Sequence, residues 1–220
     1  MRTPDSARTR GCQKKNNQAM LDFESLIFNI DINRSAIPHA GSLLVAEPFL
    51  RERYFHHSVI CLVDYEERGS AMGIVLNNRT SYTLQDLLPS VTASVTIPVY
   101  CGGPMSCERL YFVHTLGDLI PSSREIVDGL YIGGDFDTMI SIVNDGYALE
   151  GSMRFFIGYS GWGVEQLDEE LRKNVWAVTD IPSVSDLLRG EEDPYWHRIV
   201  RSMGTPYRGW LYHPRNLQSN

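Results

Sequence analysis

The segment GYSGWG, residues 158–163, ends an apolar run and precedes a charged helical pattern, and such a corner can hold a nucleophile or an anion. A nucleophile elbow requires the spacing G-x-S-x-G on a strand-to-helix turn. Here Gly161 directly follows Ser160, so the spacing fails although the context fits. Asp180 and His197 follow in the chain order that a triad would need, but a chain of this size contains such a pair by chance.

An anion cradle at the same corner is also disfavoured. The chain has neither a G-x-G-x-x-G loop nor a P-loop lysine there. The helical pattern that follows begins with acidic residues that complement the helix dipole and repel a bound anion; they are Glu165, Asp168, Glu169 and Glu170.

A structural corner is therefore the favoured interpretation. Val164, Leu167 and Leu171 lie three and four residues apart and predict one apolar stripe on a helix. The glycines permit positive φ angles and close backbone approach. Trp162 is expected to pack over the junction.

Histidines and cysteines supply a second set of reactive groups. His56 and His57 are adjacent, and neighbouring side chains along a strand point in opposite directions, so they are poor joint metal ligands. Cys101 and Cys107 enclose Gly-Gly-Pro at a spacing outside that of zinc fingers. We therefore predict no metal and no cofactor.

Several polar and glycine residues occur where predicted strands end, and loops at strand ends commonly carry function. If these ends converge, they form a concave polar ligand pocket from Asn77, Gly102, Gly103, His114, Tyr159, Ser160, Gly161 and Trp162. His114 could serve as a general base near neutral pH. The alternative is a histidine that hydrogen-bonds a neighbouring loop.

The elements that would position these residues alternate irregularly. Short apolar runs bounded by turn residues predict strands, among them SLLVA, SVICLV, AMGIVL, IPVYC, RLYFVHTL, GLYIG, MRFFIGYS and VWAVTDI. Helical patterns cover 83–91, 135–146, 163–174 and two segments after residue 182. Because long helices do not alternate regularly with the strands, the pattern favours an α+β fold over a doubly wound sheet.

Charge divides the chain into segments. Residues 1–18 hold five cationic residues and one acid, a net charge of +4. Because the whole chain has a net charge of −7, residues 19–220 carry −11. We expect a disordered basic arm over 1–18, a helix and linker over 19–40, one domain over 41–205 and an extended tail over 206–220. An acidic body and the absence of a helix-turn-helix pattern disfavour direct DNA binding.

Compartment and assembly follow from composition. The chain has no apolar run long enough to span a membrane and no secretory signal, and its four cysteines form no CxxC pair. These features predict a soluble cytoplasmic protein with no membrane partner. Aromatic residues near the C-terminus, including Trp210, predict packing within the chain or a homo-oligomer contact.

Several motifs together resemble the YqgE/AlgH family of bacterial proteins. They are LLVAEPFL, the strand end GIVLN, the GGP segment at 102–104 and GYSGWGVEQLDEE, and the resemblance covers roughly 41–180. Ser160 stands where the family often has alanine, which argues against a nucleophilic role.

The resemblance implies an α+β fold with a bent, partly barrel-like mixed sheet flanked by helices. Family members are often labelled transcriptional regulators, without a recognised DNA-binding motif and without established catalytic residues. We therefore expect an uncharacterised binding or regulatory protein with an unknown protein or small-molecule partner, acting indirectly on transcription. The alternative is an enzyme, a hydrolase or transferase, with a strand-end site near His114 and Tyr159.

Overall fold

The computed structural model describes residues 37–52 and 54–212. The basic arm expected over 1–18 and nearly all of the helix and linker expected over 19–40 lie outside these residues. Within the described part of the chain, no helix is long and apolar enough to cross a bilayer.

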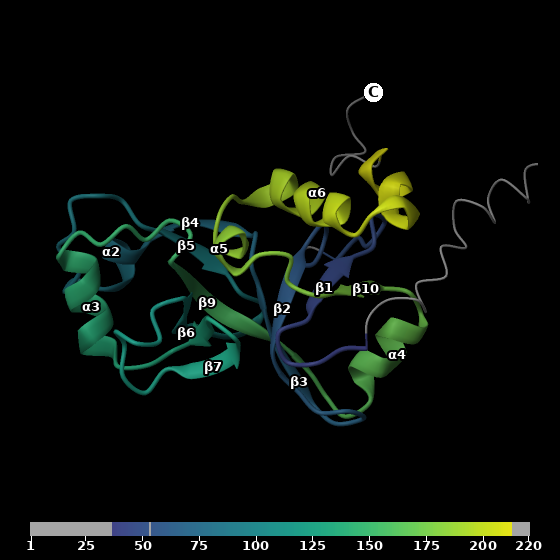
Figure 1. Ribbon diagram of the computed structural model, residues 1–220, viewed down its shortest axis with the longest axis horizontal. Helices are drawn as coiled ribbons and strands as arrows, with labels where there is room; N and C mark the ends of the chain where they lie inside the picture. The colour runs from purple at the N-terminus through teal and green to yellow at the C-terminus, as the bar shows by residue number, and fades with distance from the viewer. Residues whose placement is uncertain (1–36, 53, 213–220) are drawn as a thin grey trace, which may run out of the picture. The chain divides into compact units, whose positions relative to one another are not determined.

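Strands dominate the described residues (Figure 1). They are β1 (Leu43–Ala46), β2 (Val59–Tyr65), β3 (Ala71–Val75), β4 (Arg79–Thr83), β5 (Pro98–Cys101), β6 (Met105–His114), β7 (Arg124–Val127), β8 (Leu130–Ile132), β9 (Met153–Trp162) and β10 (Trp176–Thr179). The helices are α2 (Leu84–Leu87), α3 (Phe136–Asn144), α4 (Gln166–Arg172), α5 (Val184–Leu187), α6 (Glu192–Ser202) and the 3-10 helix η2 (Thr205–Tyr212).

The strands form one ten-stranded sheet whose main path runs β10-β1-β2-β3-β9-β6-β8-β7. Strand β9 is a branch point, because β5 also pairs with it and β4 pairs with β5. The β5–β9 pair is parallel and the other pairs are antiparallel. The predicted α+β class with a mixed sheet is confirmed, and the sheet does not close into a barrel.

Two strands were not expected from the pattern. Strand β4, RTSYT, has only exposed and half-buried residues, so it lacks the apolar alternation that marks a strand. Strand β7, REIV, is short and carries one buried residue, Ile126. Both lie at edges of the sheet, where few side chains need to be apolar.

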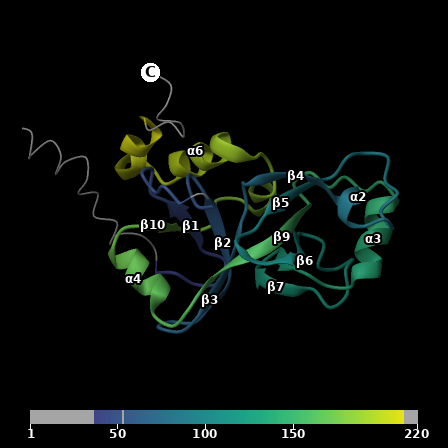
Figure 2. The same ribbon diagram turned by 180° about the vertical axis from the view of Figure 1, so that it is seen from behind.

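Strands β1, β2, β3 and β10 are covered on both faces. Leu167 of α4 packs with Trp162, Trp176 and alternate residues of these strands on one side. On the other side α6 contacts β1 and β2, and Trp196 donates a hydrogen bond of 3.0 Å from Nε1 to the carbonyl of Ala46. Figures 1 and 2 show α4 and α6 on opposite sides of these strands. Double coverage explains why every residue of β1 is buried.

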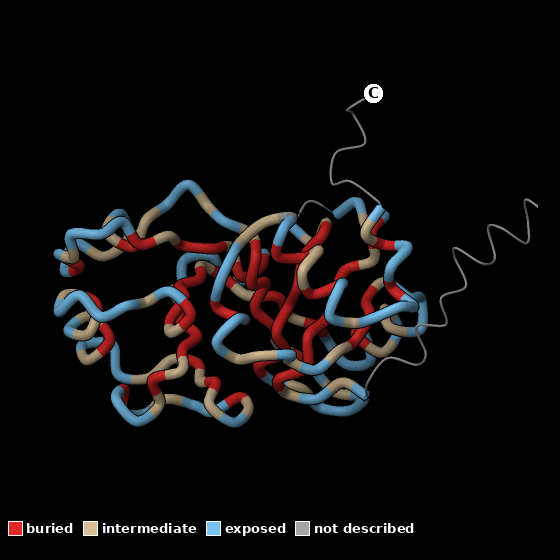
Figure 3. Tube along the Cα trace, turned by 45° about the horizontal axis from the view of Figure 1, so that its top comes forward, coloured by how far each residue is buried: buried red, intermediate tan, exposed pale blue. Residues whose placement is uncertain are grey.

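A second apolar cluster lies where β9 begins. Phe155 and Phe112 pack there with Met139 and Val143 of α3 and Leu84 of α2. Helices α2 and α3 each begin with a side-chain cap. Thr83 forms a capping box with Asp86, and the Asp135 carboxylate accepts from the amide of Thr138. Figure 3 shows that buried positions concentrate along the strands.

The C-terminal segment differs from the expected extended tail. Residues Thr205–Tyr212 form η2, which contacts α6. The Trp210 ring stacks on Trp196 with centroids 6.3 Å apart, and Trp210 is 6% exposed. Trp210 therefore packs within the chain, which is one of its two predicted roles, and the homo-oligomer contact stays a prediction. Residues 213–220 lie outside the described part of the chain.

Candidate functional site

The glycines of the GGP segment and of GYSGWG meet at a backbone crossing. The chain between β5 and β6 passes over β9, so a Cβ on Gly102 would lie 2.3 Å from the carbonyl oxygen of Gly158. A Cβ on Gly103, whose φ is +149°, would lie 2.3 Å from the backbone of Tyr159. Only glycine permits two backbones to approach this closely. The close approach expected at the GYSGWG corner is confirmed at Gly158, whose neighbour across the crossing is the carbonyl of Gly103. The part that Gly102 and Gly103 take in it was not expected from the sequence.

Ser160 serves this crossing. Its side chain is buried, and its hydroxyl donates a hydrogen bond of 3.2 Å to the carbonyl of Gly102. The same carbonyl accepts the amide of Val75 at 2.9 Å. The hydroxyl therefore links β9 to the segment that crosses it.

The two tryptophans beside the corner share one acceptor. Trp162 and Trp176 donate from Nε1 to Oε2 of Glu170, at 2.8 and 2.7 Å. Trp162 is 5% exposed, as expected for a residue that packs over the junction. The predicted stripe is wrong at Val164, which is 74% exposed because α4 begins only at Gln166.

His114 has a structural environment. Its ring is fully buried, Nε2 lies 2.9 Å from the carbonyl oxygen of Gly133, and Nδ1 accepts the amide of Leu116 at 3.1 Å. This arrangement requires the tautomer protonated at Nε2. Burial lowers the pKa of His114, against the opposing effect of the Gly133 bond. His114 thus fits the second of its two predicted roles, a histidine that hydrogen-bonds a neighbouring loop.

Asn77 joins three segments. Its side chain accepts the amide of Val59 at 2.9 Å and donates to the carbonyls of His57 and Glu192, at 2.9 and 3.0 Å. These bonds fasten the end of β3 to the start of β2 and of α6. Asn77 is 1% exposed, so its amide is used within the fold.

The predicted set converges only in part. Gly102, Gly103 and Ser160 meet at the crossing. Tyr159, Gly161 and Trp162 line a nearby cavity of about 490 Å³. His114 is paired with Met153, six residues along β9 from Tyr159, which is roughly 20 Å in a strand. His114 and Tyr159 therefore do not share a site, and the role of the other residues in ligand binding stays a prediction.

The expected divergence of the two histidines is wrong. His56 and His57 lie in a turn before β2, and their rings stack with centroids 4.4 Å apart. The His57 ring also stacks on Trp196 at 4.1 Å. The thiols of Cys101 and Cys107 both contact the carbonyl of Gly103, at 3.6 and 3.7 Å. Within the described residues, no group of three or more His, Cys, Asp or Glu gathers as a metal site.

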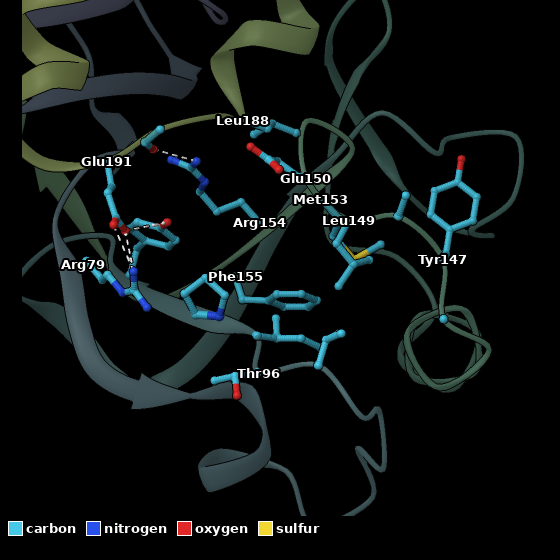
Figure 4. A pocket seen from close by; sticks show the side chains of 17 residues that line it. Arg79, Thr96, Tyr147, Leu149, Glu150, Met153, Arg154, Phe155, Leu188 and Glu191 are labelled. Atoms are coloured by element: carbon cyan, nitrogen blue, oxygen red, sulfur yellow. Dashed lines mark hydrogen bonds and ion pairs between the residues drawn. The ribbon is translucent and has the colours of Figure 1, made fainter.

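A larger pocket of about 630 Å³ opens at the start of β9. The paired residues of β5 and β9 begin at Val99 and Phe155, so neither Met153 nor Arg154 has a ladder partner in β5. Loop 146–150, the segment before β5 and the turn between α5 and α6 surround the gap. Figure 4 shows side chains from all of these segments around the pocket.

One end of the pocket is polar. Arg154 is 6% exposed and donates to the carbonyls of Leu76 and Gly190, at 2.9 and 2.8 Å. Its guanidinium lies 4.4 Å from the centroid of the Tyr100 ring. Burial lowers the pKa of Arg154, but an arginine side chain stays charged at neutral pH.

A second arginine completes the polar end. Arg79 Nη1 lies 2.9 and 3.1 Å from the two carboxylate oxygens of Glu191. The Tyr100 hydroxyl donates to the same carboxylate at 3.2 Å. Burial is the main reason that the pKa of Tyr100 is raised, so its hydroxyl remains a donor at neutral pH.

The rest of the pocket is largely apolar. Its wall includes Ile97, Pro98, Leu149, Met153, Phe155 and Leu188. A concave, mostly apolar cavity with a few polar groups at one end is the usual form of a small-molecule site.

Sequence reasoning missed this pocket. The available signal was Arg154, a cation inside the apolar run MRFFIGYS, because buried arginines need a specific environment. The remaining wall comes from loops whose proximity the sequence pattern does not reveal.

Comparisons with known proteins identify the family of this chain. Residues 43–208 match the family model described as AlgH-like. A UPF0301 protein of Parabacteroides distasonis is 39% identical over 195 residues, covering 88% of this chain and 97% of that protein. A UPF0301 protein of Bacteroides thetaiotaomicron is 36% identical, covering 89% and 97%.

Solved structures agree on the fold. A crystal structure of a Corynebacterium diphtheriae protein has a TM-score of 0.63 at 20% identity, covering 81% of this chain and 94% of that one. The solution structure of the AlgH protein from Pseudomonas aeruginosa has a TM-score of 0.62 at 23% identity, covering 78% and 93%. From the family match and the curated relatives, this chain belongs to the AlgH-like family.

Proposed function

We propose that this protein is a cytoplasmic binding module that takes a small molecule in the pocket around Arg154 and acts indirectly on transcription through a protein partner. The observation that carries the proposal is the pocket itself, about 630 Å³ in volume and largely apolar away from the end at Arg154 and Arg79. Cavities of this size bury most of the surface of a small ligand.

The pocket lies next to the start of α6, so ligand binding there would change the conformation of a surface helix. Its wall includes Gly190 and Glu191, which directly precede α6. Arg154 bonds the carbonyl of Gly190, and Asn77 bonds the carbonyl of Glu192 in the first turn of α6. A ligand that shifts this turn would change the start of α6. In this proposal, α6 and η2 form the surface that a partner protein or a second copy of the chain contacts.

The indirect route follows from charge. Residues 19–220 carry a net charge of −11, which opposes contact with the phosphates of nucleic acid. A partner that itself binds nucleic acid would carry the effect to transcription.

The enzyme alternative receives less support from the geometry. It needs a titratable group in an accessible pocket near His114 and Tyr159. His114 is fully buried with both ring nitrogens in hydrogen bonds, and it lies far along β9 from Tyr159.

Two threonines of one loop provide a matched test. Thr96 is exposed and lines the pocket, and Thr92 is exposed outside the set of lining residues. We would screen metabolites by thermal shift against the wild-type protein, Thr96→Trp and Thr92→Trp. The proposal expects a metabolite that raises Tm for the wild type and Thr92→Trp but not for Thr96→Trp, where the indole fills the cavity. A Tm shift of equal size in all three proteins would place binding elsewhere and refute the proposed site.

A further inference from the structure

The charge at the buried end of the pocket has no acidic counterpart in direct contact. Arg154 uses two of its five N–H donors on the carbonyls of Leu76 and Gly190. Among the described residues, no carboxylate oxygen lies within the 4.0 Å of an ion pair with this guanidinium. These two bonds leave three N–H donors of Arg154 unused, and its positive charge has no carboxylate in contact.

The acid that is closest in the wall is already engaged. Both oxygens of the Glu191 carboxylate face Arg79, and one also accepts the Tyr100 hydroxyl. The polar end therefore combines the buried Arg154 with an Arg79–Glu191 ion pair whose charges offset each other, which leaves a net charge of +1. The other acid of the wall, Glu150, is exposed, so solvent and salt screen its charge.

An apolar surface continues from this charged end. Phe155 and Ile97 are almost fully buried, and Leu149 and Met153 extend the wall towards Tyr147 (Figure 4). A ligand that matches this order of groups has an anionic head and an apolar body. A carboxylate fits the fork of a guanidinium with two parallel hydrogen bonds.

We propose that the pocket binds amphipathic monocarboxylates, with the carboxylate on Arg154 and the apolar body along Phe155 and Ile97. The inference rests on the proposed function and adds the chemical class of the ligand. Arg154 selects the head group, and the length of the apolar wall selects the body.

Three decyl compounds test the head group, each used below its micellar concentration in isothermal titration calorimetry. They are decanoate, decanol and decyltrimethylammonium, which share the chain and differ in charge. The wild-type protein should bind decanoate about tenfold more tightly than decanol, because charge-assisted hydrogen bonds form only with the carboxylate. The ammonium compound should bind most weakly. Equal affinities for decanoate and decanol would overturn the assignment.

Replacing Arg154 itself would also break its bonds to Leu76 and Gly190 and disturb the fold. Two glutamate variants therefore test the charge at this end of the pocket and leave Arg154 in place. In Glu191→Gln, the charge of Arg79 is released towards the ligand, and decanoate should bind about fivefold more tightly with decanol unchanged. Glu150→Gln makes the same change at the exposed rim and should have a smaller effect. Weaker binding of decanoate to Glu191→Gln, or an equal gain for decanol, would contradict a carboxylate on this end.

The Thr96→Trp variant separates the two proposals. If it abolishes binding of all three compounds while the wild type binds them equally, the pocket stands and the anionic head is wrong. If decanoate binds Thr96→Trp as tightly as the wild type, the pocket is not the site and the proposed function fails with it.

Discussion

The hydroxyl of Ser160 donates a hydrogen bond of 3.2 Å to the carbonyl of Gly102, at the point where the chain crosses β9. This bond gives the serine a structural role. We expect Ser160→Ala to lower the free energy of unfolding by about 1 kcal/mol, the usual contribution of one hydrogen bond, and to leave ligand binding unchanged. Urea denaturation measures the first effect and calorimetry the second. A variant of wild-type stability that loses ligand binding would contradict this role.

The crossing itself predicts a severe effect at Gly103. A Cβ there would lie 2.3 Å from the carbonyl carbon and oxygen of Tyr159, so Gly103→Ala should cost about 3 kcal/mol or more of unfolding free energy. Gly129 has a φ of +75° but open space around it, so Gly129→Ala should cost only about 1 kcal/mol of backbone strain. Chemical denaturation compares the two. Equal losses would show that strain, and not the crossing, sets the cost.

His114 predicts how stability changes with pH. Burial lowers its pKa below 6.5, so the unfolded chain binds a proton at a pH where the folded chain does not. Its contribution is fully present above the unfolded pKa and is lost as pH falls through that value towards the lower folded pKa. Denaturation between pH about 8 and about 5.5 should therefore show a loss of stability on acidification that is smaller in His114→Gln. The same dependence in both proteins would contradict this assignment.

The cysteines should differ in reactivity. Burial raises the pKa of Cys61 to about 12, and its thiol is inaccessible, whereas Cys107 is exposed and Cys101 is partly buried. In a Cys12→Ser background, iodoacetamide should modify Cys107 first, Cys101 more slowly and Cys61 only after unfolding. Peptide mass spectrometry gives the order. Rapid modification of Cys61 in the folded protein would show that β2 opens locally.

The sequence predicted most strands and helices because their apolar residues recur at the period of the element. It predicted close backbone approach at the glycine corner of residues 158–163 and the packing of Trp162, because both follow from residue types that lie side by side in the chain. It did not predict that Gly103 takes part in the crossing. The polar strand β4 and the helical turns of η2 lack such a pattern. The pocket depends on where β5 begins relative to Arg154, and strand register between distant segments is set by tertiary packing.

Strand β9 pairs with β3, β5 and β6, although its residues enter the chain only after position 152. During synthesis, the edges of β3, β5 and β6 that pair with β9 therefore lack their hydrogen-bond partners until β9 has been made. Such dependence on sequence-distant partners slows folding, and unpaired edges are prone to association between chains. A fragment that stops before Met153 would lack β9, the strand that joins β3 to β5 and β6. We expect such a fragment to aggregate and not to form a smaller folded unit.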